Sequence, residues 1–288
     1  MTSRATGPSL RRRNVINSVM IGLTYGAALV ATLPLLFILG YLLLKGATSI
    51  NLNFFTQLPP PPGETGGGMG NAIMGTLLLI AVAASIGLPI GIGSGLYLAE
   101  RGESKLANVV RFLADVLNGL PSIVVGIFAW QILVRRVGHF SALAGGLALG
   151  AMMIPLVSRT TEEMIRLVPV ALREAALALG YQRWRTSLAV VLRTALPGIV
   201  TGALVAVARI AGETAPLLFT AFGNQFWSFA IDEPIAALPL QIYVFAISPY
   251  DDWHRLAWAG ALVLIGVVFV ISLAARAATR SRFGSHGD

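Results

Sequence analysis

The sequence of 288 residues contains no cysteine, two lysines and three histidines. Without cysteine, neither a disulfide nor a thiolate metal site is possible. The histidines are scattered, and the sequence has neither an HExxH motif nor a nucleophile elbow. Neither lysine follows a glycine, so the Gly-Lys-Ser/Thr core of a nucleotide-binding P-loop is also missing. Any ATP-driven function would therefore need ATP hydrolysis by another protein.

Charged residues are few, at 12% of the chain, whereas hydrophobic residues make up 56%. A soluble domain has about 25% charged residues. So much apolar surface needs an apolar solvent, and the composition therefore predicts an integral membrane protein. The net charge of +8 would suggest nucleic acid binding in a soluble protein. Here the arginines flank apolar runs, where they fix the topology, and we expect no nucleic acid partner.

Six apolar runs reach the length of ~20 residues that a transmembrane helix needs. Helix is the expected structure because backbone polar groups in lipid must be satisfied within the segment. The predicted fold class is therefore an all-α membrane protein with six transmembrane helices. The predicted spans are about Ser18 to Leu44, Asn71 to Leu98, Phe112 to Val134, Phe140 to Ser158, a fifth that begins near Leu196 and continues past Arg209 and Glu213, and Leu256 to Ala275.

The distribution of arginine and lysine predicts the orientation of these spans. With the N-terminus in the cytoplasm, the two tails and the inner loops hold most of the positive charges, in agreement with the positive-inside rule. The outer side then holds Lys45, Arg135, Arg136 and Arg255. Both termini are therefore expected in the cytoplasm. The first run follows three arginines but exceeds the ~7–15 apolar residues of a signal peptide, so we expect a retained helix.

Two outer segments are predicted to be solvated connections. The first joins a stiff polyproline stretch, Leu58 to Gly63, to the flexible Gly66 to Gly68, and this pattern indicates an exposed connector. The second lies between the fifth and sixth spans and carries acidic residues, which we expect to be solvated or to meet a basic partner. These acidic residues are Asp232, Glu233, Asp251 and Asp252.

The inner loop after the fourth span is predicted to contain a short helix. Pro169 suits the first helical position, where its missing N–H is not needed, and Gly180 suits a C-terminal cap with positive φ. The residues between them are good or fair helix formers. Ala171, Ala175 and Ala178 would then form a small-residue face that another protein can approach closely. The alternative is a helix that lies on the lipid headgroups.

The sequence of this loop resembles the cytoplasmic EAA loop of ABC importer permeases. Glu174-Ala175-Ala176 is followed at the family's offset by Gly180, between the fourth and fifth of six spans. The Leu-Pro that usually ends the motif reads Leu192-Arg193, and Leu-Pro stands at Leu196-Pro197 instead. The resemblance implies that Glu174, Ala175, Ala176 and Gly180 couple the loop to a partner ATPase. The alternative for Glu174 is an exposed residue paired with Arg173 or with solvent.

Three further motifs restrict the resemblance to one family of ABC importer permeases. They are Asn118 to Ser122 (NGLPS), Arg159 to Glu162 (RTTE) and Gly212 to Pro216 (GETAP). Over roughly Asn71 to Ala275 the chain resembles the PstA family of phosphate importer permeases, which implies a prokaryotic cytoplasmic (inner) membrane location. The family implies a type I, MetI-like permease core. The implied division is a tail, first span and outer loop at 1–70, the transmembrane domain with its coupling loop at 71–277, and a cytoplasmic tail at 278–288.

The same resemblance implies the partners. A PstC-like second permease subunit would complete the pathway, and a PstS-like external protein would deliver inorganic phosphate. A dimer of a PstB-like ATPase would bind ATP with Mg²⁺ and hydrolyse it. This chain would bind no cofactor of its own and would be a transport subunit rather than an enzyme.

Ionisable residues within spans indicate the substrate pathway, because each costs about 2.5–3.5 kcal/mol on insertion scales. Arg209 and Glu213 are four residues apart and are predicted to share one face of the fifth span. Arg159 and Glu162 have helical spacing at the inner end of the fourth span. A guanidinium fits a phosphate oxyanion bidentately, and a nearby carboxylate would hold it when the site is empty. The alternative is a set of structural salt bridges between helices.

Two neighbouring acidic residues are poorer candidates for the pathway. Asp115 follows Arg111 by four residues, a spacing that predicts a local ion pair. Glu163 is expected on the surface.

Three other functions stay open at this point. A permease of the same fold could carry another oxyanion, such as molybdate, sulfate or phosphonate. A self-contained ion-coupled transporter would have charged residues in the middle of several spans and would leave the EAA loop unexplained. A membrane enzyme would need a catalytic motif that the sequence lacks.

Overall fold

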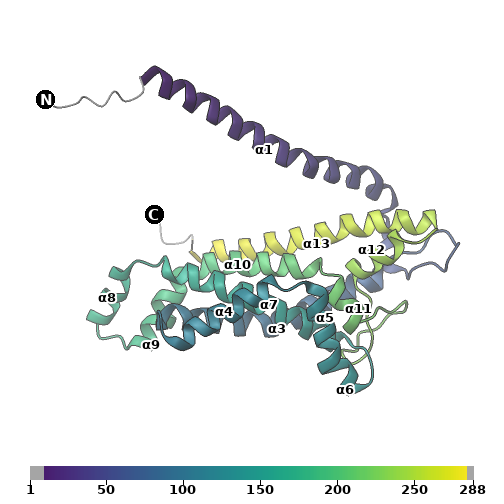
Figure 1. The fold of residues 1–288 in the computed structure, drawn as a ribbon. Helices are drawn as coiled ribbons and strands as arrows, with labels where there is room; N and C mark the ends of the chain where they lie inside the picture. Colours follow the sequence, from purple (N-terminus) through teal and green to yellow (C-terminus); the bar gives the residue numbers. More distant parts are fainter. Residues whose placement is uncertain (1–9, 284–288) are drawn as a thin grey trace.

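The computed structural model describes residues 10–283, whose regular structure is almost entirely helical (Figure 1). Within this range one isolated bridge, between Phe222 and Ile235, resembles strand pairing. Short segments of 3-10 or π-helix lie at Ala47–Ser49, Trp130–Val134 and Thr186–Val191. The α-helices are α1 (Leu10–Gly46), α2 (Leu52–Thr56), α3 (Gly70–Arg101), α4 (Lys105–Gly119), α5 (Ser122–Ala129), α6 (Arg135–Val137), α7 (Ala142–Arg166), α8 (Val170–Ala178), α9 (Arg183–Arg185), α10 (Leu192–Ala211), α11 (Ala215–Thr220), α12 (Leu238–Ala246) and α13 (Asp251–Phe283).

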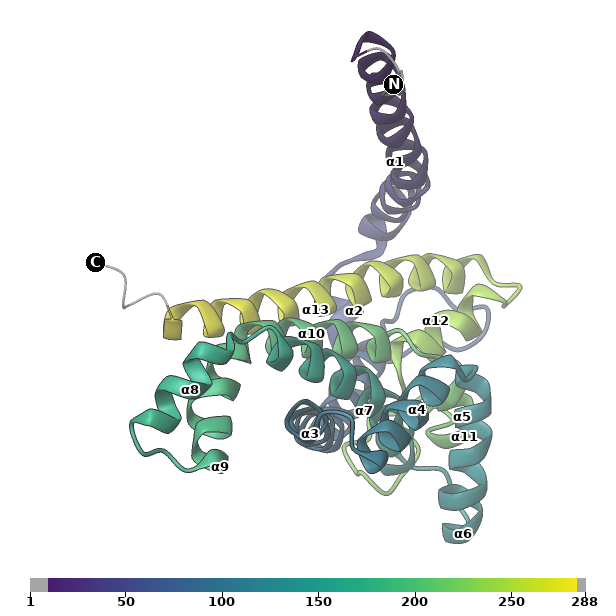
Figure 2. The same cartoon turned by 60° about the vertical axis from the view of Figure 1, so that its left-hand side comes forward.

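Two helices, α3 and α7, form the centre of the bundle, with α10 against α7 and α13 along α10 (Figures 1 and 2). The two helices lie close together because α3 places glycines on the shared face. A Cβ atom at Gly91 would lie 2.7 Å from the Cβ of Val157, and one at Gly95 would lie 2.5 Å from the carbonyl oxygen of Ser158. Small residues let membrane helices pack backbone to backbone. The buried core around this contact contains Leu79, Ala83, Leu149, Met153 and Val157.

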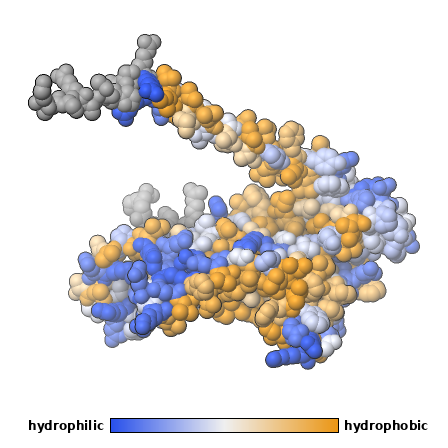
Figure 3. Space-filling view, viewed as in Figure 1, coloured by the Kyte–Doolittle hydropathy of each residue, from blue (hydrophilic) through white to orange (hydrophobic). Residues whose placement is uncertain are grey.

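The bundle has two ends, which we name the α8 end and the α12 end. The last turns of α3 and α7 lie at the α8 end together with α8 and α9, and α12 lies at the opposite end with the beginning of α3 (Figure 1). In Figure 3, hydrophobic residues cover most of α1 and the middle of the bundle, and hydrophilic residues gather over the α8 end and over the α12 end. This distribution is typical of a membrane-spanning body with polar ends.

Five helices in the described range are long and apolar enough to cross a membrane, and the bent pair Lys105–Gly119 and Ser122–Val137 makes a sixth if it is counted as one span. The sequence predicts this third span as one helix from Phe112 to Val134, which is wrong. The chain turns by 104° between Gly119 and Ser122. Proline disfavours helical geometry in the residue before it, and Leu120, which precedes Pro121, is extended with a ψ of 137°.

The fifth span begins and ends earlier in the sequence than predicted, since it covers Arg183–Ala211. α10 ends at Ala211 and does not continue past Glu213. Gly212 follows the last helical residue, and a new short helix, α11, begins with Pro216 in its first turn. Glu213 therefore lies in the connection between two helices, and the prediction that it shares a helical face with Arg209 is wrong.

The first outer loop is an exposed connector only in its middle, residues 61–66, whereas its two ends are built into the α12 end. Phe54 on α2 and Met69 at the end of the loop are fully buried. Both pack in an apolar cluster with residues of α12 and α13. The indole N–H of Trp253 also donates to the carbonyl oxygen of Pro60 at 3.2 Å. Two apolar side chains thus hold both ends of the loop on the bundle.

Only the C-terminal turns of helix α1 lie on the bundle, and its N-terminal part extends away from it (Figures 1 and 2). Its C-terminal part packs on α13, where Leu42 is buried and Gly46 approaches the backbone of Trp258. Most of the remaining helix is apolar and exposed. The natural neighbour of this surface is lipid or another subunit.

Candidate functional site

The inner loop forms the predicted short helix, α8. The helix begins one residue after Pro169, which occupies the N-cap rather than the predicted first helical position. Gly180 has the positive φ predicted for it, +85°. The N–H of Tyr181 donates to the carbonyl of Ala176 at 3.1 Å, and the N–H of Gly180 donates to that of Leu177 at 3.0 Å. This is the Schellman pattern of a helix C-terminus, and it turns the chain sharply after α8.

The four predicted coupling residues do not share one face of this segment. Glu174, Ala175 and Gly180 are exposed, whereas Ala176 is 6% exposed and faces the bundle. Within residues 10–283 no ion pair or side-chain hydrogen bond involves Glu174, and Arg173, its possible partner, bonds a residue of α3 instead. The segment therefore presents a free carboxylate and small side chains outward, while Ala176 anchors it inward.

A cluster of charged side chains joins α4 and α7 near the α8 end. The Glu162 side chain is 2% exposed, and three guanidinium groups surround its carboxylate. Arg111 of α4 approaches to 2.7 Å through Nε, Arg166 to 2.8 Å and Arg159 to 3.1 Å. Asp115 of α4 pairs with Arg159 at 3.0 Å. We name these five residues the charge clamp.

The charge clamp corrects the prediction that Asp115 pairs with Arg111. The Arg111 guanidinium turns instead to the buried Glu162, and its Nη2 also donates to the carbonyl oxygens of Leu98 and Gly102 at 3.0 and 2.6 Å. The Asp115 side chain is 56% exposed, so water screens its charge, whereas a buried carboxylate needs a counter-ion. Arg111 thereby also caps the carbonyl end of α3.

Arg159 and Glu162 are the two clamp residues that were predicted in the pathway, and Arg111 and Arg166 are two that the prediction missed. Glu162 is saturated by arginines, and Arg159 keeps access to solvent with 32% of its side chain exposed. Arg166 follows Glu162 by four residues, a spacing that sequence reasoning can use. Arg111 is 51 residues away from Glu162, and no local pattern indicates it. Glu163 is exposed, as predicted.

The other predicted pair lies where α10 ends. Arg209 is in the last turn of α10, and its Nε atom is 3.9 Å from Oε1 of Glu213. The Arg209 side chain is 45% exposed and the Glu213 side chain 18%. Thr201 and Val205, two turns and one turn earlier, are also exposed. The last turn of this membrane-spanning helix therefore carries an accessible guanidinium, after an uncharged stretch of helix.

The two predicted pathway pairs lie at different levels of the bundle. α7 and α10 run in opposite directions, and Gly202 of α10 packs against Thr160 of α7. Arg209 is seven residues beyond Gly202, which places it about 10 Å farther toward the α12 end at 1.5 Å per residue. Arg159, the neighbour of Thr160 in α7, therefore does not share a site with Arg209.

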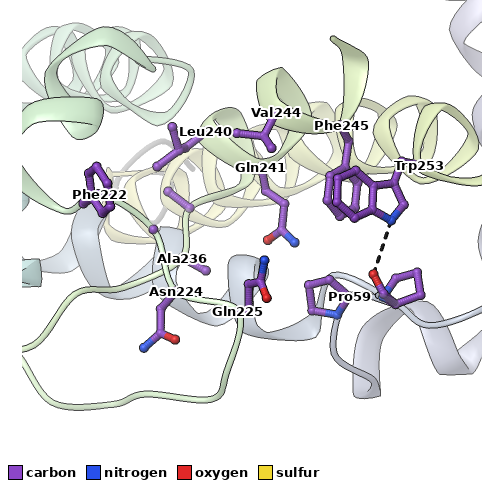
Figure 4. A pocket seen from close by; sticks show the side chains of 13 residues that line it. Pro59, Phe222, Asn224, Gln225, Ala236, Leu240, Gln241, Val244, Phe245 and Trp253 are labelled. Atoms are coloured by element: carbon purple, nitrogen blue, oxygen red, sulfur yellow. Dashed lines mark hydrogen bonds between the residues drawn. The ribbon is translucent and has the colours of Figure 1, made fainter. Parts of the chain in front are cut away.

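A pocket of about 280 Å³ lies at the α12 end, between the first outer loop, the turn after α11, and α12 (Figure 4). The amide groups of Gln225 and Gln241 point toward each other in it, and Oε1 of Gln241 has no hydrogen-bond partner among the described residues. The stacked rings of Phe245 and Trp253, 4.4 Å apart, form part of its apolar wall. Sequence reasoning missed this pocket because distant segments build it. Neither here nor elsewhere in residues 10–283 do three side chains come together to hold a metal ion.

Comparison with solved structures identifies the architecture. A bacterial alginate ABC transporter, solved in complex with an alginate-bound periplasmic protein, is similar with a TM-score of 0.66 at 15% sequence identity, over 96% of this chain and 99% of that chain. The MetNI methionine ABC transporter is similar with a TM-score of 0.58 at 20% identity, over 74% of this chain and 96% of that chain. The fold is therefore that of type I, MetI-like importer permeases, as predicted.

Comparison of sequences identifies the family. The model of the family described as "Binding-protein-dependent transport system inner membrane component" matches residues 87–282. The protein named "Phosphate transport system permease protein PstA" is 47% identical in Yersinia pestis, over 96% of this chain and 93% of that protein. The protein of the same name in Xylella fastidiosa (strain Temecula1) is 49% identical, over 96% of both. The chain therefore belongs to the PstA family of phosphate transport permeases.

Proposed function

We propose that this chain is the permease subunit of an ATP-driven importer of inorganic phosphate and forms half of its translocation pathway. The observation that carries the proposal is the accessible Arg209 guanidinium at the end of a membrane-spanning helix of a PstA relative. A guanidinium stays charged and bonds two phosphate oxygens at once. The 3.9 Å separation from Glu213 leaves Arg209 free to turn toward an anion, which offsets part of the anion's dehydration.

Arg159 serves in this proposal as a second contact, about 10 Å nearer the α8 end. Its exposed part faces the anion, while Glu162 and Asp115 hold its guanidinium in place. Glu162 has a holding role only, because three arginines already surround its carboxylate.

We further propose that α8 docks on a PstB-like ATPase dimer, which binds ATP with Mg²⁺, so that this chain needs no cofactor. Support comes from the unpaired Glu174 carboxylate and the exposed Ala175. The buried Ala176 and the turn at Gly180 fix the segment against the bundle, so that force on it reaches the spans.

The remaining partners follow from the two ends of the bundle. We propose that the α8 end and both termini face the cytoplasm, because the arginines concentrate there. The exposed side of α1 then meets the PstC-like second permease subunit or lipid. The pocket at the α12 end faces outward, where a PstS-like phosphate-binding protein docks. The structurally similar alginate transporter is likewise solved with a periplasmic protein.

The test of the proposed function is Arg209→Gln in the complete transporter, reconstituted with its ATPase and phosphate-binding protein. We expect phosphate uptake to fall about 10- to 100-fold, since hydrogen bonds to charged groups contribute about 1.5–3 kcal/mol. The assembly should purify intact. Arg255→Gln is the matched control, because Arg255 is an exposed arginine at the α12 end that pairs with Asp252. Normal phosphate uptake by Arg209→Gln would make Arg209 a structural residue.

The same vesicles test the substrate. Uptake of phosphate in preference to sulfate, molybdate and phosphonate supports the proposal. Preferential uptake of another oxyanion would keep the permease role and replace the substrate.

A further inference from the structure

Arg173 of α8 points toward the bundle, although it is next to the outward-facing Glu174. Its Nη1 lies 2.7 Å from Oε1 of Glu100 in the last turn of α3, and its Nη2 donates to the carbonyl oxygen of Ile165 in α7 at 3.3 Å. The side chains of Arg173 and Glu100 are 24% and 33% exposed. One guanidinium thus joins three helices.

The rest of α8 is attached to a different part of the chain. It packs mainly on the π-helical segment Thr186–Val191, which leads into α10. Within the described part of the chain, the side-chain hydrogen bonds from α8 to α3 and α7 all come from Arg173. Helix α8 therefore has two attachments, a packed one toward α10 and an ionic one toward α3.

The ionic attachment reaches a firmly held helix end. Glu100 is close in sequence to Leu98 and Gly102, whose carbonyls bond Arg111 of the charge clamp. The clamp ties α4 to α7, and glycines hold α3 against α7 along its length. A displacement of Glu100 would therefore move α3 and α7 together.

We propose that the Arg173–Glu100 ion pair is a positioning link that transmits movement of α8 to the α3–α7 pair. The inference rests on the proposed function of α8 as the ATPase-docking helix. Without the link, α8 moves the α3–α7 pair only indirectly, through the packing of α10 on α7, so less of the movement reaches α3 and ATP is hydrolysed with less phosphate transported.

The experiment measures phosphate transported per ATP hydrolysed in the complete, reconstituted transporter. The variants are Glu100→Gln, Arg173→Gln and the charge swap Arg173→Glu with Glu100→Arg. We expect each single change to lower the ratio about five-fold, at the lower end of coupling between sites. The charge swap should restore most of the ratio. Glu103→Gln is the matched control, because Glu103 is an exposed acid near the end of α3 that forms no ion pair with any other residue of 10–283.

Glu100→Gln is the decisive variant, because Glu100 lies on α3 and not on the proposed docking surface. An unchanged ratio in this variant overturns the inference. Loss of the ATPase from the purified Glu100→Gln assembly also overturns it, since the residue would then act in docking. Glu174→Lys separates the two proposals. Normal coupling in Glu174→Lys refutes α8 docking itself, whereas uncoupling in Glu174→Lys with a normal Glu100→Gln refutes only the link.

Discussion

Replacement of Glu162 by glutamine tests whether the charge clamp is structural. The carboxylate is 2% exposed and faces three arginines, so its loss leaves the guanidinium of Arg111, with 14% of its side chain exposed, without a counter-ion. Removal of one partner of a buried ion pair costs about 3–5 kcal/mol. Arg159 keeps Asp115, and Arg166 is 53% exposed, so both contribute little to this cost.

The lower part of this range, about 3 kcal/mol, is expected, because the glutamine amide oxygen still accepts a hydrogen bond from Arg111. A domain of this size loses about 2–4 °C in Tm per kcal/mol. Thermal unfolding of the purified assembly should therefore shift down by about 6–12 °C. Glu163→Gln, the exposed neighbour, should change stability by less than about 0.5 kcal/mol.

A second measurement separates stability from transport. Glu162→Gln combined with Arg111→Met should be more stable than the sum of the two single effects predicts, because no unpaired buried charge remains. The reasoning fails if Glu162→Gln unfolds at the same temperature as Glu163→Gln while phosphate uptake is lost. Glu162 would then act on the anion itself.

Three further changes have defined outcomes. Glu174→Lys should leave the chain inserted and abolish ATP-driven uptake, because it reverses the carboxylate at the proposed docking surface, and normal uptake would contradict that role. Gly91→Ala should lower the unfolding temperature, since its Cβ would lie 2.7 Å from that of Val157 and overpacking costs about 1–3 kcal/mol. Gly93→Ala, which has nothing within 4 Å, should leave that temperature equal or higher, and equal losses in both variants would contradict the packing argument. Trp253→Phe removes the hydrogen bond to Pro60 and should speed amide hydrogen exchange in the first outer loop through a loss of about 1 kcal/mol, whereas unchanged exchange would show that the buried Phe54 and Met69 hold this loop without it.

Local patterns predicted the parts of the fold that depend on local chemistry. Apolar runs located the spans, and the Pro169 and Gly180 signals located α8 to within a residue. The break at Pro121 also had a local cause, but an apolar composition on both sides favoured one continuous helix in the prediction. The burial of Phe54 depends on α12 and α13, which are far away in the sequence.

In the candidate site, too, contacts between residues close in sequence could be predicted, whereas contacts between distant residues could not. Arg159 and Arg166 lie within one turn or so of Glu162, so helical spacing relates them. Arg111 reaches Glu162 across 51 residues, and only the packing of α4 on α7 brings the two together. The pocket beside Gln241 likewise exists only after three segments meet.

The corner between α4 and α5 limits what can surround the chain. The 15 residues of α4 cover about 22 Å at 1.5 Å per residue, less than the ~30 Å of hydrocarbon in a bilayer. A helix of this length that starts at one membrane surface ends within the hydrocarbon, and its last carbonyl groups, at the corner by Leu120, then need partners that acyl chains do not offer. A water-filled vestibule or a neighbouring protein is therefore expected beside this corner, in place of lipid alone.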